Sequence, residues 1–262
     1  MKKVLLLCVL LVLTGSYSIA QSPYARVNVG YALSAASQEM GAEIESGGNV
    51  TQKYGSLGQG INLGLGIGYH FNENVAAELG FSYLLGRKYE FKASDNIGSQ
   101  TSTITGRGLF FVPALVLSTD FEADLAPYVR AGVIVGLPSM VTEDENVQVR
   151  PVVGSLTTEE TKERHYGGVS LGFSGALGIH YKIGDNLALF GEAQFNALSY
   201  RPSKWEIEES KSNGQDVLDR INVTKGDYVD EYKASDRKEQ EREGFAAPFS
   251  SIGLNIGVKI SF

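Results

Sequence analysis

The chain shows a strict alternation of large apolar residues with small or polar ones. Between Ile61 and Phe71 every second residue is large and apolar, and asparagine, glycine or histidine stands between them. This period of two is typical of a β-strand, whose successive side chains point to opposite faces. The apolar face runs for about eleven residues, the length that a tilted strand needs to cross a bilayer. The small opposite face indicates a narrow, packed interior.

The same alternation recurs along the chain and predicts eight strands. The fourth is apolar on both faces, so the pattern does not set its orientation, and Pro113 removes a ladder hydrogen bond there, which predicts a local bulge. The predicted strands are Tyr24–Leu33, Ile61–Phe71, Val75–Leu85, Leu109–Leu117, Tyr128–Leu137, Val169–Tyr181, Leu187–Tyr200 and Gly253–Phe262.

The connections between these strands alternate in length. Those after the second, fourth and sixth strands are short, whereas residues 34–60, 86–105, 138–168 and 201–250 form long ones. Outer-membrane barrels have short periplasmic turns and long external loops. The sequence therefore predicts an all-β fold, an eight-stranded antiparallel up-and-down transmembrane β-barrel. An even number of strands places both termini on the periplasmic side.

Two of the long connections carry further patterns. Residues 88–92 and 101–105 alternate, which predicts that the third and fourth strands extend as a hairpin above the membrane. Residues 227–243 are rich in charge and stop at Gly244, a candidate helix C-cap. The pattern leaves an exposed helix and a solvated loop open for that segment.

The first twenty residues have the features of an export signal. Lys2 and Lys3 precede an apolar run over residues 4–13, and small residues follow at 18–20. We expect cleavage before Gln21, which leaves residues 21–262 as one barrel domain. Cys8 would leave with the signal, so the exported chain would have no disulfide, no thiol catalysis and no cysteine metal site. The net charge of −7 gives nucleic-acid binding no electrostatic support.

Three features resemble the OmpA/OmpX-like eight-stranded outer-membrane β-barrel superfamily, in particular its Bacteroidetes-type barrels. One is the signal peptide followed by eight amphipathic strands. Residues 112–115 followed by 126–132 resemble the central hairpin of those barrels. The terminal strand, residues 254–262, closes on Phe262 and resembles the signal that the outer-membrane barrel-assembly machinery recognises. The resemblance implies a bacterial outer-membrane location, with membrane lipid and that machinery as partners. It implies no cell-wall tether, because no further domain follows the strands.

Several charged residues fall on the predicted inward face, near the periplasmic ends of their strands. An eight-stranded barrel has room inside for little more than side chains, and buried charges must be paired or hydrated. We therefore favour a structural salt-bridge and hydrogen-bond cluster over a gated ion path. The cluster comprises Arg26, Glu78, Arg130, Glu192 and Lys259.

No catalytic, cofactor or metal site emerges from these residues. Glu78 and Glu192 would suit paired-carboxylate catalysis, but a filled lumen gives a substrate no route to them. His70 and His180 precede matching turns, and without a third ligand at suitable spacing they favour interior packing over metal binding. His165 lies in the third long connection and is predicted to be solvated; with no marked serine partner, it gives an enzyme little support.

The predicted function is that of a structural or binding platform, not an enzyme, displaying long, mostly acidic external loops to a surface or host ligand. A narrow channel and a lipid-modifying enzyme remain alternatives. Trp205 and Ile207 form a small amphipathic patch on the largest loop, which would contact lipid headgroups, contact a partner or pack within the loop.

Overall fold

The computed structural model describes residues 22–45, 47–95, 98–149, 156–230 and 239–262. The predicted signal peptide, residues 1–20, lies outside these ranges. Among the described residues, no helix is long and apolar enough to cross a membrane.

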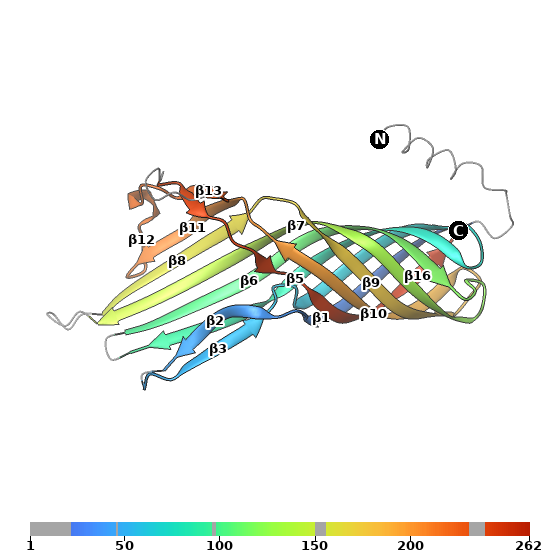
Figure 1. Ribbon diagram of the computed structural model, residues 1–262, viewed down its shortest axis with the longest axis horizontal. Coiled ribbons are helices and arrows are strands. Elements are labelled where there is room, and N and C mark those ends of the chain that lie inside the picture. The colour runs from blue at the N-terminus through green and yellow to red at the C-terminus, as the bar shows by residue number, and fades with distance from the viewer. Residues whose placement is uncertain (1–21, 46, 96–97, 150–155, 231–238) are drawn as a thin grey trace.

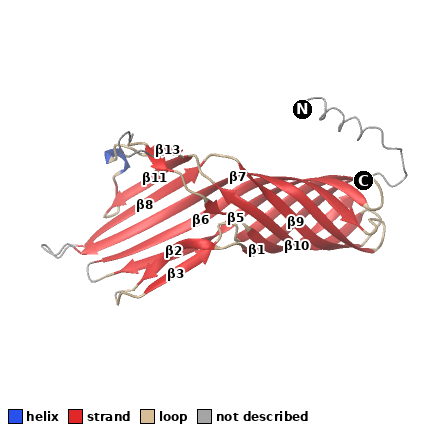
Figure 2. Ribbon diagram, viewed as in Figure 1, coloured by secondary structure: helices blue, strands red, loops and turns tan. Residues whose placement is uncertain are grey.

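Eight antiparallel strands form a closed ring, in which each strand pairs with two others and β1 pairs with β16. Figures 1 and 2 show this ring as a cylinder whose strands run obliquely to its axis. The strands correspond in order to the eight predicted ones. They are β1 (Pro23–Ser34), β4 (Gly60–His70), β5 (Val75–Ser94), β6 (Gly98–Ser118), β7 (Leu125–Val149), β9 (Ser170–Lys182), β10 (Leu187–Tyr200) and β16 (Ser251–Ser261).

The outer wall of the ring carries the large apolar residues, as the alternation predicts. Leu65, Leu177 and Leu254 are more than half exposed, whereas their chain neighbours Gly66, Ala176 and Asn255 are buried. An apolar surface of this extent, facing outward along every strand, is stable against lipid and not against water.

The interior is narrow because large inward residues of β1 lie opposite glycines of β4. A Cβ atom on Gly68 would lie 2.2 Å from Tyr24 Cζ, and one on Gly66 would lie 2.8 Å from Arg26 Cγ. The glycines in the alternating pattern therefore leave the space that these side chains fill. The opposed pairs are Tyr24–Gly68, Arg26–Gly66 and Asn28–Gly64.

Strand β6 corresponds to the fourth predicted strand, whose inward and outward faces the sequence pattern did not set. Val112, Ala114 and Val116 point inward and are buried, whereas Leu115 and Leu117 face outward. The predicted bulge at Pro113 is wrong, because the register to β5 runs through Pro113 without a shift. The irregularity in that pairing lies instead between Leu85 and Lys88 of β5.

At one end of the ring the connections are short turns over residues 71–74, 119–124 and 183–186. We call this the short-turn end. The first and last strands also meet there, since Tyr24 lies opposite Ser261.

At the other end β5, β6 and β7 continue past the ring, and further strands join them into a sheet extension (Figure 1). The predicted β5–β6 hairpin is confirmed. The connection over residues 138–168 is long, as predicted, but it is a strand hairpin that the pattern did not predict, because β7 runs on to Val149 and pairs with β8. The added elements are β2 (Gln38–Ile44), β3 (Val50–Gly55), β8 (Leu156–Tyr166), β11 (Lys204–Ser212), β12 (Gln215–Asp216), η1 (Leu218–Arg220), β13 (Lys225–Val229), β14 (Glu241–Glu243) and β15 (Ala247–Pro248).

The helix considered for residues 227–243 is absent from the described part of that segment. Lys225–Val229 is strand β13, and Glu241–Glu243 pairs with it in parallel as β14. Residues 231–238 lie outside the described ranges.

Candidate functional site: the barrel interior

Four buried charged side chains meet across the lumen. Arg26 comes from β1, Glu78 from β5, Arg130 from β7 and Glu192 from β10. Glu192 Oε1 lies 3.0 Å from Arg26 Nη2 and 2.7 Å from Arg130 Nη2. Glu78 lies 3.7 Å from a guanidinium nitrogen of each arginine. Two positive and two negative charges thus balance within one layer, which we call the ionic layer.

Neutral donors also hydrogen-bond to the two carboxylates. Tyr24 donates its hydroxyl proton to Glu78 over 3.0 Å, and Tyr128 donates to Glu192 over 2.9 Å. Asn255 Nδ2 also donates to Glu192, over 3.2 Å. Buried ions are tolerated only when such hydrogen bonds replace the water they lose. Glu192 meets that requirement through both arginines and two neutral side chains. Glu78 accepts a hydrogen bond from Tyr24, but Glu78 Oε1 and Arg130 Nε are buried without a hydrogen-bond partner among the described residues.

Lys259, the fifth residue of the predicted cluster, lies apart from the ionic layer. Its Nζ is 5.3 Å from the ring centroid of Tyr24 and 5.2 Å from that of Phe121, and it makes no salt bridge among the described residues. The structure therefore brings Arg26, Glu78, Arg130 and Glu192 together, and leaves Lys259 to contact aromatic rings.

A row of aromatic rings fills the short-turn end of the barrel. Phe121, in the turn between β6 and β7, lies between His70 and His180, with ring centroids 4.5 and 6.1 Å away. Tyr24 stacks on the far side of His70 at 4.6 Å. The pattern gave no sign of this role for Phe121 beyond a large aromatic residue standing between acidic ones in a short turn.

The two histidines do not form a metal centre in the described part of the chain. Phe121 separates their rings, and no group of three His, Cys, Asp or Glu residues there could hold a metal ion. His70 Nδ1 lies 3.2 Å from Ser22 Oγ, and both imidazoles are buried among rings.

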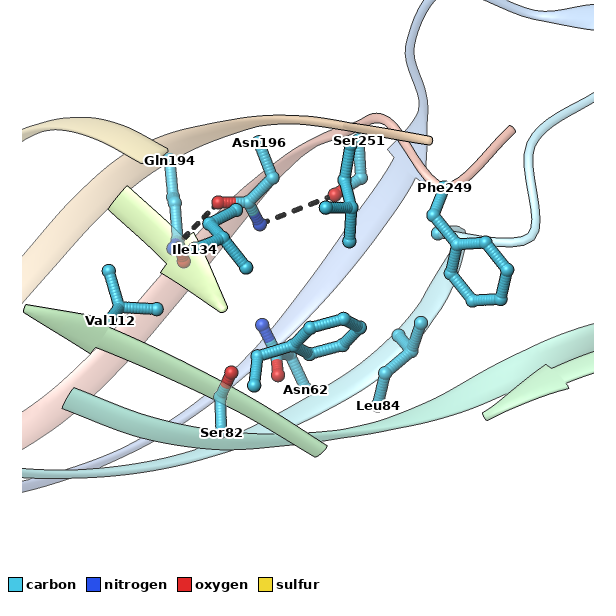
Figure 3. Close-up of a pocket in the computed structure, with 12 residues that line it drawn as sticks. Asn62, Ser82, Leu84, Val112, Ile134, Gln194, Asn196, Phe249 and Ser251 are labelled. Atoms are coloured by element: carbon cyan, nitrogen blue, oxygen red, sulfur yellow. Dashed lines mark hydrogen bonds between the residues drawn. The ribbon is translucent and has the colours of Figure 1, made fainter. Parts of the chain in front are cut away.

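A polar layer follows the ionic layer along β10, toward the sheet extension, since Gln194 and Asn196 come after Glu192 on that strand. Gln194 donates to Asn196 over 3.1 Å, and Asn196 donates to Ser251 over 3.4 Å (Figure 3). Two cavities of about 20 Å³ border this layer, one lined in part by Asn62 and Ser82 and the other in part by Arg26 and Gln194. Each has room for about one water molecule.

An apolar cluster covers the lumen where the ring meets the sheet extension. Leu57 and Phe249 come from connecting segments and pack on Leu198, Tyr200 and strand residues of the wall. The two segments are joined by hydrogen bonds from Leu57 N, over 2.8 Å, and from Ser56 Oγ, over 3.1 Å, to Pro248 O. The alternation did not predict this cluster, because Leu57 and Phe249 lie outside the alternating runs and nearly 200 positions apart.

His165 is buried in the sheet extension, which overturns the prediction that it is solvated. Its Nδ1 lies 2.7 Å from Tyr228 Oη, and its Nε2 lies 3.2 Å from Thr142 Oγ1. Glu163 lies 3.4 Å away and is itself held by Arg242. Burial lowers the pKa of His165 from its ordinary value, so the folded sheet favours the neutral imidazole.

Trp205 is also buried, so of the three roles considered for it, packing within the loop is the one observed. Its ring lies 3.5 Å from Arg242 Cζ, a cation–π contact. The acidic runs of the same sheet lie in cross-strand ion pairs on its outer face. Glu143 pairs with Lys88, and Glu206 and Glu208 pair with Arg164.

The profile of the family described as "Outer membrane protein beta-barrel domain" matches residues 4–224 of the chain. The chain belongs to this family. It is therefore an outer-membrane β-barrel protein, and lipid surrounds its outward apolar wall in the bacterial outer membrane. No curated protein sequence matches the chain.

Solved structures similar to this outer-membrane barrel include Neisserial surface protein A, with 12% identity, a TM-score of 0.38, and coverage of 93% of this chain and 99% of that one. CarO2 of Acinetobacter baumannii shows 12% identity and a TM-score of 0.38 over 94% of this chain and 100% of that one. The outer membrane protease OmpT of Escherichia coli shows 8% identity and a TM-score of 0.35 over 94% and 99%. None of these similarities assigns a function.

Proposed function

We propose that the protein is a structural and binding platform with a filled interior, inserted with its termini in the periplasm and its sheet extension outside the cell. The ionic layer is the observation that carries this proposal. Arg26 and Arg130 reach Glu192 from opposite parts of the ring, so the layer extends across the lumen. A permeating ion would have to displace these pairs.

The layers on either side support the same proposal. Phe121 and its neighbouring rings occupy the short-turn end, and Leu57 and Phe249 occupy the opposite end. The two cavities between them each have room for about one water molecule, which supports a filled interior. The enzyme alternative finds little support, because both ring nitrogens of His165 already lie within hydrogen-bond distance of protein oxygens.

The filled interior is tested by planar-bilayer recording of the purified protein. We expect no steady conductance from the wild type, because the ionic layer blocks the lumen. Discrete, lasting conductance steps in the wild type would refute the proposal and favour the narrow-channel alternative. Lipid mass spectrometry of cells with and without the protein tests the enzyme alternative; a new lipid species that is lost in His165→Ala would establish it.

The orientation is tested with two matched cysteine variants labelled by a membrane-impermeant maleimide on intact cells. Asp219→Cys lies in the sheet extension and should be labelled, and Asp185→Cys lies in a short turn and should not. The reverse result would invert the orientation. We also propose that the barrel-assembly machinery recognises the end of β16, where Phe262 is exposed; Phe262→Ala should slow insertion into the outer membrane without changing the folded state.

A further inference from the structure

The lipid-facing wall contains a groove that the platform role does not use. It has a volume of about 770 Å³ and runs across the outer faces of β1, β4, β5, β6 and β7. Two rows of paired outward residues line it. One row is Leu63, Tyr83, Leu109 and Leu137, and the other is Leu65, Phe81, Phe111 and Val135.

The floor of the groove is shaped by aromatic residues. The rings of Phe81 and Phe111 meet edge to face with centroids 5.1 Å apart. Rigid rings flanked by leucines hold a fixed concave shape, whereas a smooth aliphatic wall would offer lipid chains no particular position. The groove is therefore suited to hold acyl chains in defined places.

An exposed cation lies directly above this groove, toward the sheet extension. Arg107 is two residues beyond Leu109 on the same outward face of β6, and it pairs across the sheet with Leu85 and Ser139. Two residues of a strand span about 7 Å. Among the described residues Arg107 makes no salt bridge, whereas the nearby Lys88 is paired with Glu143. An unpaired guanidinium is thus placed at the boundary between apolar wall and solvent.

We infer that this groove and Arg107 form a specific binding site for a phosphorylated, multiply acylated glycolipid of the lipid A class. The acyl chains lie over Phe81 and Phe111, and a headgroup phosphate accepts hydrogen bonds from Arg107. Arginine is suited to this role because its planar fork binds phosphate through two donors at once. The inference rests on the proposed orientation, which places this end of the wall in the outer leaflet.

Native mass spectrometry of the full-length protein released from detergent tests this binding site, with hexa-acylated bis-phosphorylated lipid A as probe. We expect one adduct that survives activation in the wild type. Arg107→Gln should weaken retention by about tenfold, the ratio expected from losing a charge-assisted hydrogen bond. Phe81→Ala with Phe111→Ala should reduce it further. Heat-modifiable migration on SDS gels verifies that each variant is folded.

Matched controls lie on and just beyond β10, across the ring from β5. Arg201→Gln removes another exposed arginine, and Phe195→Ala removes another outward ring; both should retain lipid A as the wild type does. Equal losses in these controls would overturn the inference, as would equal retention of phosphatidylglycerol, because either would indicate an ordinary lipid annulus. A conducting wild-type barrel would refute the proposed function without affecting this result, so the two failures are distinguishable.

Discussion

The ring and the sheet extension each contain an ion pair with the same nitrogen–oxygen distance, one buried and the other exposed to water. Arg26 Nη2 lies 3.0 Å from Glu192 Oε1, and Lys88 Nζ lies 3.0 Å from Glu143 Oε2. The side chains of the first pair are 7% and 0% exposed, and those of the second are 66% and 43% exposed. An exposed pair is screened by water and stabilises little, whereas a buried one becomes costly when either partner is lost.

Strand β7 passes through both regions, and its outward side chains differ between them. In the ring its outward residues include Val133 and Leu137, which face lipid. In the extension the same outward face carries Glu143 and Glu145, which face water. The register between β7 and β6 does not shift along the strand, although Val112 and Pro113 of β6 form no ladder pair with β7. The outward residues of one continuous strand are therefore apolar where lipid surrounds it and charged where water does.

The largest expected effect comes from removing the centre of the ionic layer. Glu192→Ala leaves Arg26 and Arg130 without their shared carboxylate, and we expect the free energy of unfolding to fall by about 3–5 kcal/mol. Urea titration in lipid vesicles measures this change. The matched exposed variant, Glu143→Ala, should cost less than about 1 kcal/mol. Similar losses in the two variants would show that burial does not decide the energy of these pairs.

The next largest effect is expected from a charge on the outward face, which should lower stability in the ring but not in the sheet extension. Leu177→Arg, near the middle of β9, should cost about 2–4 kcal/mol because lipid surrounds that face. Val50→Arg, on the exposed edge strand β3, should change stability by no more than about 0.5 kcal/mol. The same vesicle titration compares them, and a harmless Leu177→Arg would argue that water surrounds the ring.

Interior packing gives a smaller expected effect. The methyl group of Gly68→Ala would meet the Tyr24 ring, and overpacking of this kind costs about 1–3 kcal/mol. Gly191→Ala is the control, since a methyl group there meets nothing within 4 Å. Thermal unfolding followed by heat-modifiable migration distinguishes the variants. Equal midpoints would mean that the interior is loose enough to absorb the added carbon.

The smallest effect concerns pH and is confined to the sheet extension. Burial and Arg242 lower the pKa of His165, whereas Glu163 and Asp144 oppose that shift. A histidine with a lowered folded pKa binds fewer protons when folded, so stability falls as the pH drops below about 6.5. Protection of the Tyr228 amide, which donates to Ser203 O, should decline in hydrogen exchange corrected for intrinsic rates. His165→Asn should abolish the decline; if it persists there, another group is responsible.

The ring was predictable from sequence because lipid requires apolar side chains at the outward positions of every strand. Leu187–Tyr200 of β10 coincides with its prediction for this reason. The upper part of β7 was missed because Thr142 and Glu143 are polar on both faces and leave no hydrophobic period. The pairing of Leu57 with Pro248 depends on distant parts of the chain, which a local pattern does not encode.

The same limit applies to the interior. Inward charges were recognisable one strand at a time, since a polar residue on the inward face of a membrane strand stands out. Which charges meet is not set by strand pairing alone, since Lys259 is the cross-strand partner of Arg26 and yet its Nζ lies 5.2 Å from the Phe121 ring centroid. The sequence around His165 does not predict its burial, because the rings that contact it, Tyr228 and Phe245, lie more than sixty residues away.

A double-mutant cycle tests the central claim most directly. It measures the coupling free energy between Arg26 and Glu192 and compares it with that between Lys88 and Glu143, using alanine at each position under identical vesicle conditions. We predict that the buried pair couples more strongly than the exposed pair by at least about 1 kcal/mol. Equal coupling in the two pairs would contradict the account that a filled, water-poor lumen holds the barrel together.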